Sequence, residues 1–126
     1  MEKSFEDLLV WQKAHQLVLR IYEITKEFPK EEVFGLTTQL RRAVSSITMN
    51  IVEGTGLSSQ AEFRRTLYIA RGSLKEVQYQ VLLSKDLGYI SKDTYDELKT
   101  DIHEIGKLLN GLINSVNSRL RPGSCR

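Results

Sequence analysis

Residues 35–56 read GLTTQLRRAVSSITMNIVEGTG, and this stretch predicts a helix with two unlike faces. Apolar side chains recur in it at steps of three and four residues, the spacing that places them on one side of an α-helix. These residues are Leu36, Leu40, Ala43, Val44, Ile47 and Ile51. A second stripe beside them is rich in amides, with a hydroxyl and one arginine, and lacks the many lysines and glutamates of a solvated surface. It contains Gln39, Arg42, Ser46, Asn50 and Glu53.

This second stripe has two interpretations. It is the half-exposed polar edge of a core helix, or its side chains hydrogen-bond one another inside a bundle or across a contact between subunits. The residue types complement one another, so we favour the second interpretation. We expect Gln39, Arg42, Asn50 and Glu53 to form a structural polar network and not a catalytic site.

A first helix is expected from the N-cap Ser4 to Phe28, where Pro29 ends it. Its apolar residues form two stripes, where a small monomeric bundle needs one. One stripe consists of Val10, Ala14, Leu17, Ile21, Ile24 and Phe28, and the other of Leu8, Trp11, Val18 and Tyr22. The double stripe indicates a wide buried arc and, with it, a second partner beyond the core of the chain itself.

Two further helices follow the central one. The pair Ser59 and Glu62 forms a capping box, which predicts a helix over residues 60–87. Ser91 caps the last helix, which continues to Leu120. Both segments carry an apolar seam at steps of three and four residues, and no segment shows the alternation of a strand. The pattern predicts an all-α, antiparallel up-down-up-down four-helix bundle over residues 1–120.

Three glycine positions carry specific expectations. We expect Gly54-Thr55-Gly56 to end the central helix through the left-handed backbone conformation that glycine tolerates. Gly88 is expected to end the third helix in the same way. Gly72 lies inside the third helix, where glycine lowers helix propensity, and this indicates a close approach by another backbone or a bulky side chain.

Composition restricts the class of protein. With 126 residues, 40% hydrophobic and 27% charged, the chain is expected to be one soluble domain, and residues 121–126 a flexible tail. The single cysteine, Cys125, forms no internal disulfide, which favours a reducing compartment. The charged N-terminus does not match a signal peptide, and no apolar run is long enough to cross a membrane. We expect a cytoplasmic protein.

A basic cluster is the best candidate for a binding site. Arg64, Tyr68, Arg71 and Lys75 share one flank of the third helix, with Arg65 around the corner. Two more arginines, Arg41 and Arg42, lie on the central helix; we count Arg41 as the sixth candidate binding residue and assign Arg42 to the polar network. Arginines suit phosphate oxygens and a tyrosine can stack on an unpaired base, so this pattern favours nucleic acid. The alternative is a solvated face paired with local carboxylates, because the net charge is only +2.

Catalytic and metal sites are not expected. A di-iron bundle needs a glutamate three residues before histidine, but Gln12 precedes His15 and Thr100 precedes His103 at that spacing. No nucleophile motif or phosphate-binding loop occurs in the sequence. We therefore expect no cofactor and no enzymatic activity.

Several short motifs together resemble the four-helix-bundle family of 23S rRNA intervening-sequence proteins. They are residues 7–11 (DLLVW), 28–29 (FP), 34–36 (FGL), 39–43 (QLRRA), 50–54 (NIVEG), 62–63 (EF), 70–73 (ARGS) and 87–89 (LGY). The resemblance implies a homopentameric, barrel-like ring, and a relation to accessory variability proteins of diversity-generating retroelements, which bind nucleic acid and a reverse transcriptase. Thr48 replaces a frequent proline of the family, and Leu57 a frequent arginine; the second change removes a charge near a candidate anion site.

The favoured function is that of a non-enzymatic, oligomeric protein that binds nucleic acid, with structured RNA favoured over DNA, or serves as a scaffold. The alternative is a protein–protein adaptor ring without nucleic-acid binding, for example an accessory subunit of a reverse transcriptase. A metalloenzyme is a third and less favoured class.

Overall fold

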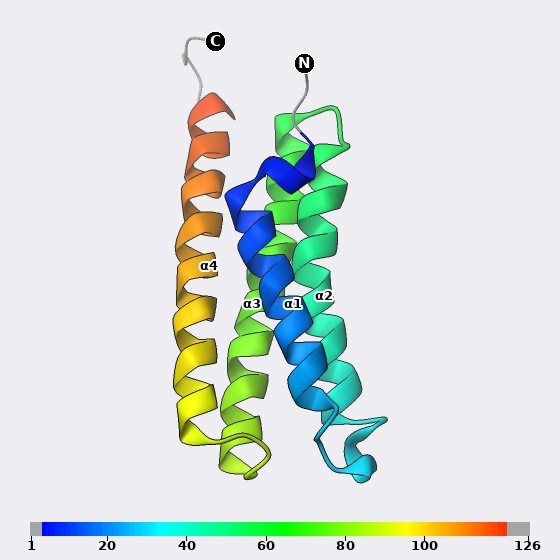
Figure 1. Cartoon of the computed structure of the whole chain (residues 1–126). Coiled ribbons are helices and arrows are strands. Elements are labelled where there is room, and N and C mark those ends of the chain that lie inside the picture. The colour runs from blue at the N-terminus through cyan, green and yellow to red at the C-terminus, as the bar shows by residue number, and fades with distance from the viewer. Residues whose placement is uncertain (1–3, 121–126) are drawn as a thin grey trace.

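The computed structural model describes residues 4–120 and consists of four long helices that pack side by side (Figure 1). They are α1 (Leu9–Thr25), α2 (Leu36–Thr55), α3 (Gln60–Asp86) and α4 (Lys92–Leu120). Two short 3₁₀ turns, η1 (Phe5–Asp7) and η2 (Lys30–Glu32), precede α1 and α2. Successive helices run in opposite directions, and residues 4–120 contain no strand. The prediction of an all-α four-helix bundle is confirmed, while the expected tail, 121–126, lies outside the described residues.

The core lies along the inner faces of all four helices. The whole apolar stripe predicted for the central helix is buried, from Leu36 to Ile51, and the matching stripes of α1, α3 and α4 close around it. Thr48 is also buried, and its hydroxyl donates a hydrogen bond to the carbonyl of Ser45 (2.9 Å). The helix therefore continues past this position, as expected where threonine replaces proline.

The first helix is shorter than predicted at both ends. Ser4 caps η1 by accepting a hydrogen bond from the Glu6 N–H (3.2 Å), and the extended Leu8 separates this turn from α1. The turn folds back because Phe5 packs edge-on against Trp11, with ring centroids 4.9 Å apart. At the other end the hydrogen bonds after Thr25 shift to the tighter three-residue spacing before Pro29.

The second stripe of α1 lies largely over its own bundle. Leu8, Trp11 and Val18 are partly buried against the core, and the Trp11 ring stacks on His15 at 4.8 Å. Only Tyr22 in this stripe is exposed. Most of this stripe is thus covered by the chain's own bundle. It therefore no longer indicates that a second partner covers α1.

The glycines behave differently from one another. Gly88 has a φ of 82°, and the N–H groups of Gly88 and Tyr89 bond the carbonyls of Lys85 and Ser84, so the predicted left-handed end of α3 is confirmed. The central helix ends at Gly54-Thr55-Gly56 as predicted, with Gly56 as its C-cap, but the predicted left-handed conformation is wrong, because Gly56 has a φ of −91° and Gly54 lies inside α2. Gly54 is instead required by packing: a Cβ there would lie 2.5 Å from Phe63 Cδ1 and still closer to Thr66 Oγ1.

Gly72 does not match its expectation. A Cβ built at this position has no heavy atom within 4 Å, so no group of residues 4–120 approaches it closely. The glycine therefore lowers helix propensity at an open surface, without a packing reason inside the chain.

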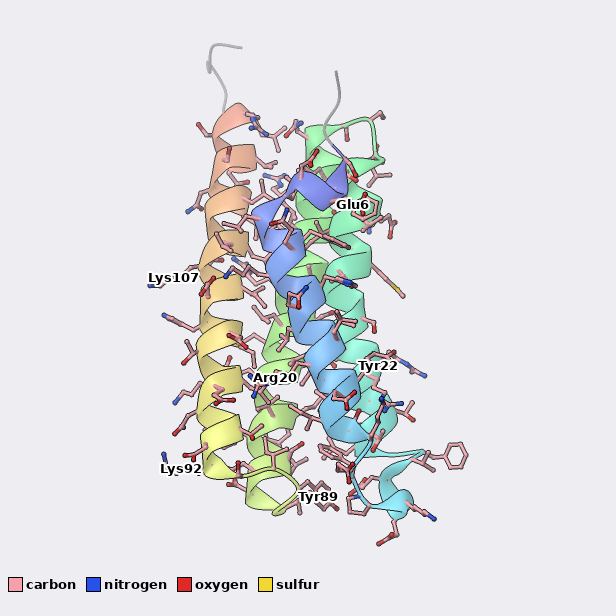
Figure 2. The ribbon with its side chains drawn as sticks, viewed as in Figure 1. Glu6, Arg20, Tyr22, Tyr89, Lys92 and Lys107 are labelled. Carbon is pink, nitrogen blue, oxygen red and sulfur yellow. The ribbon has the colours of Figure 1, made fainter. Side chains whose placement is uncertain are left out.

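Glu32 joins the α1–α2 connection to the α3–α4 loop, at the end of the bundle where Figure 2 labels Tyr89. Its Oε1 accepts a hydrogen bond from the Leu36 N–H (3.0 Å), at the start of α2, and its Oε2 accepts one from the Tyr89 hydroxyl (2.8 Å). The N–H donor and then the hydroxyl donor lower the pKa of Glu32. The same contact raises the pKa of Tyr89.

This contact makes a pH-dependent prediction. A carboxylate with a lowered pKa stabilises the fold above its unfolded pKa, and the contribution disappears as the pH falls through its folded pKa. Glu32→Gln should lower the melting temperature at pH 7, and the difference from wild type should shrink below about pH 4. Thermal unfolding followed by circular dichroism measures both. The neighbouring Glu31→Gln is the control; an equal effect of both variants at pH 7 would contradict the role of Glu32.

Among the helices of residues 4–120, none combines the length and apolar character that crossing a bilayer requires.

Candidate nucleic-acid interface

A groove of about 500 Å³ runs between α3 and α4. Cationic side chains line both rims: Arg71 and Lys75 on α3, and Lys99 and Lys107 on α4. His103 of α4 also lines the groove. The apolar floor consists of Leu74, Ile102 and the backbone of Gly106. Polar, uncharged side chains complete the lining, and none of the lining residues is a carboxylate.

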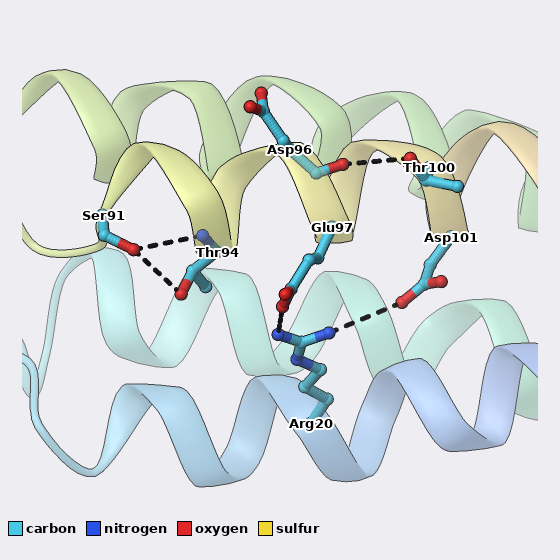
Figure 3. Close-up of polar contacts among 7 residues, drawn as sticks. All are labelled: Arg20, Ser91, Thr94, Asp96, Glu97, Thr100 and Asp101. Carbon is cyan, nitrogen blue, oxygen red and sulfur yellow. Dashed lines mark hydrogen bonds and ion pairs between the residues drawn. The ribbon is translucent and has the colours of Figure 1, made fainter.

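The absence of carboxylates from the groove follows from how α4 divides its charges. Three of its acids face α1, where Glu97 and Asp101 pair with Arg20 (Figure 3), whereas Asp96 pairs with Lys92 of α4 itself. Glu104 pairs with Lys13 on the same side, at 2.9 Å, and the hydrogen bond raises the pKa of this lysine. Lysines and a histidine occupy the α3 side of the same helix. The groove therefore concentrates positive charge although the chain as a whole is nearly neutral.

Two predicted arginines are held beside this groove by asparagines. Arg64 donates to Asn117 Oδ1 (3.0 Å), and Arg71 donates to Asn110 Oδ1 (3.2 Å). The guanidinium of Arg71 also lies 5.0 Å from the centre of the Tyr68 ring. Neutral amides orient both cations, and neither arginine forms an ion pair within residues 4–120, so both keep their electrostatic attraction for an anion.

The structure brings four of the six predicted binding residues to the α3–α4 side. They are Arg64, Tyr68, Arg71 and Lys75, and Lys75 bonds the neighbouring Gln78 at 3.3 Å. Arg65 is exposed on the other edge of α3. Arg41 lies apart as well: it donates to Thr25 Oγ1 (2.7 Å) and stacks on Tyr22, and so fastens the end of α1 to α2.

The predicted polar network does not close within one chain. Asn50 donates to the carbonyl (2.8 Å) and the hydroxyl (3.0 Å) of Ser46, which accepts a hydrogen bond from Ser73 of α3 (2.9 Å). Gln39, Arg42 and Glu53 are exposed, and no hydrogen bond or ion pair within residues 4–120 joins them. A network across a subunit contact stays a prediction.

Two cationic residues and one histidine of the groove were missed in the sequence. Lys99, His103 and Lys107 follow one another at steps of four, which places them on one face of α4. Acids interleave with them in the sequence, so the local net charge is small and hides the stripe. A helical projection of charge alone, separate from the apolar pattern, reveals it. The described residues contain no cluster of three or more His, Cys, Asp or Glu side chains that could hold a metal ion.

The fold and the groove together define a small all-helical bundle protein with a cationic inter-helix groove. The sequence profile of the family described as 23S rRNA-intervening sequence protein matches residues 6–111, and the chain belongs to this family. A solved structure from Bacteroides thetaiotaomicron VPI-5482 is similar; it is described as a protein with unknown function from the S23 ribosomal protein family. It shares 30% identity over 83% of this chain and 98% of its own, with a TM-score of 0.75. No curated protein matches.

Proposed function

We propose that this chain is a non-enzymatic RNA-binding protein that holds phosphates of structured RNA in the α3–α4 groove. The carboxylate-free cationic lining of this groove carries the proposal. Arginine and lysine on both rims suit the phosphate backbone, which dominates affinity for nucleic acid. Membership in a family named for intervening sequences of 23S rRNA is consistent with an RNA ligand.

Binding of this kind should depend strongly on salt. Each phosphate contact with a single strand contributes a slope of about −0.7 to the dependence of log affinity on log salt concentration. Titration of labelled RNA with the full chain at several salt concentrations tests the proposal. A steep loss of affinity with salt supports it, whereas no binding even at low salt would replace it with the adaptor function. A labelled DNA of the same sequence shows whether the groove distinguishes RNA from DNA.

We also propose that the chain forms a homo-oligomer, with five subunits favoured by the family resemblance. The outer face of α2 and α3 supports this assembly. Met49 (67% exposed), Ile69 (42%) and Tyr79 (61%) are apolar groups on these two helices, on which the open Gly72 also lies. Arg42 and Glu53 on α2, and Arg65 and Glu76 on α3, form no ion pair within residues 4–120. Opposite charges of a second copy could pair with them.

The mass of the particle tests this assembly. Light scattering coupled to size exclusion should give several times the chain mass of 14.5 kDa. Gly72→Arg adds bulk and charge at an open surface of α3, so it should reduce the mass if α3 lies at the contact. Gly111→Arg, on an equally open position of α4, is the matched control. A wild-type monomer at micromolar concentration would contradict the assembly itself.

The second candidate function is a cytoplasmic adaptor ring that binds a protein, such as a reverse transcriptase, and no nucleic acid. The exposed Met49, Ile69 and Tyr79 favour it, because apolar side chains on an outer face suit a protein partner. The RNA titration separates the two functions.

A further inference from the structure

We propose that the α3–α4 groove receives an unpaired nucleobase, so that its ligand is a single-stranded segment of RNA and not a duplex. This inference rests on the proposed function and specifies the ligand class. It rests on the apolar floor of the groove, whereas the proposed function rests on the cationic side chains of its rims.

The floor is apolar and is kept open by a glycine. Leu74 and Ile102 are each 5% exposed and form the base of the groove between the two helices. Gly106 lies above Leu74, since a Cβ built on this glycine would be 3.6 Å from Leu74 Cδ2. Any longer side chain at position 106 would extend over this floor. The missing side chain therefore leaves room for a flat group between the cationic rims.

The layout matches the parts of a nucleotide. A base presents an apolar face, which suits Leu74 and Ile102, and its polar edge suits the amides of Gln78 and Asn110 on the rims. Flanking phosphates suit the cations on both rims. The groove volume of about 500 Å³ lies in the range of small-ligand sites.

A duplex would contact the cationic rims of the groove but not its apolar floor. Its bases are paired and stacked inside the helix, so only phosphates reach the protein surface, and side chains cannot read its deep, narrow major groove. The rims would then be occupied and the apolar floor would stay empty. An unstacked base of a loop or a single strand can enter the groove while its backbone follows the rims.

Gly106→Met tests the floor without changing the charge. Methionine favours a helix more than glycine does, so the variant should fold, and its side chain should cover the floor. Gly111→Met is the matched control, because a Cβ at position 111 has no neighbour within 4 Å. The probes are a fluorescein-labelled 12-nucleotide oligoadenylate and a 12-base-pair RNA duplex, each titrated at low salt.

We expect Gly106→Met to weaken oligoadenylate binding roughly tenfold, the size of a lost base contact, and to change duplex binding less than about twofold. Gly111→Met should change neither. Equal effects of Gly106→Met on both probes, or none on either, would overturn the base site while RNA binding by the rims stands. Failure of the wild-type chain to bind either probe would overturn the proposed function as well.

Discussion

Reversing Lys99 and Lys107 together to glutamate should weaken RNA binding by more than about tenfold and flatten its salt dependence. Both lysines lie on the α4 rim of the groove. The acids of α4 that pair with Arg20 of α1 lie on the other side of this helix. Figure 2 shows Lys107 and Arg20 on these two sides. The substitution removes two phosphate contacts and adds repulsion between the new carboxylates and the RNA. It should reduce affinity for oligoadenylate and for duplex alike, because the rims serve both.

The control for this variant must carry the same net charge. Lys26→Glu together with Lys30→Glu also changes the formal charge by four, from +2 to −2, at exposed positions beyond the end of α1. If binding reflects the groove, the control should lose only the small part of affinity that comes from overall charge. Equal losses in the two double variants, measured by fluorescence anisotropy over a salt series, would show that net charge and not the groove governs binding.

Gly54→Ala and Gly72→Ala should change stability in opposite directions. At Gly54 the added methyl group would collide with Thr66 and Phe63 of α3, so the two helices must separate, and overpacking of this kind costs about 1–3 kcal/mol. At Gly72 the methyl group meets open space, and alanine favours the helix by up to about 1 kcal/mol. The pair compares the same chemical change in two helices of one bundle.

Denaturant unfolding at a fixed protein concentration measures both effects, because subunit contacts would make apparent stability depend on concentration. The midpoint should fall for Gly54→Ala and rise for Gly72→Ala. A loss of stability in Gly72→Ala would mean that another copy or partner packs against this glycine, a contact that light scattering would detect as a change in mass. An unchanged midpoint in Gly54→Ala would show that α2 and α3 separate easily.

The sequence predicts the helices well because their apolar stripes reach the core almost without exception. It predicts Gly88 correctly since a left-handed residue after a long helix depends on local geometry. The role of Gly54 depends on which side chain of α3 lies opposite, and local sequence does not contain this information. The break at Leu8 likewise depends on the packing of Phe5 on Trp11.

The sequence analysis identified the α3 side of the candidate site but not its α4 side. The α3 side, with Arg64, Tyr68, Arg71 and Lys75, follows from helical spacing. The α4 side requires knowing which face of α4 meets α3 and which meets α1, and this comes from the packing of the bundle. That Arg41 lies away from this groove also depends on packing, because its partner Thr25 lies on the preceding helix.

The hydrogen bonds from Arg64 to Asn117 and from Arg71 to Asn110 recur at a regular spacing along the α3–α4 contact. The two arginines are one heptad apart, and so are their partners Asn117 and Asn110, so the same cross-helix rung repeats after about two turns. One heptad further along α3, and one heptad back along the antiparallel α4, the equivalent pair is Gln78 and His103. Both of these line the groove without bridging it. The middle of the groove thus coincides with the third step of this series, where neither the arginine nor the asparagine of the first two steps occurs.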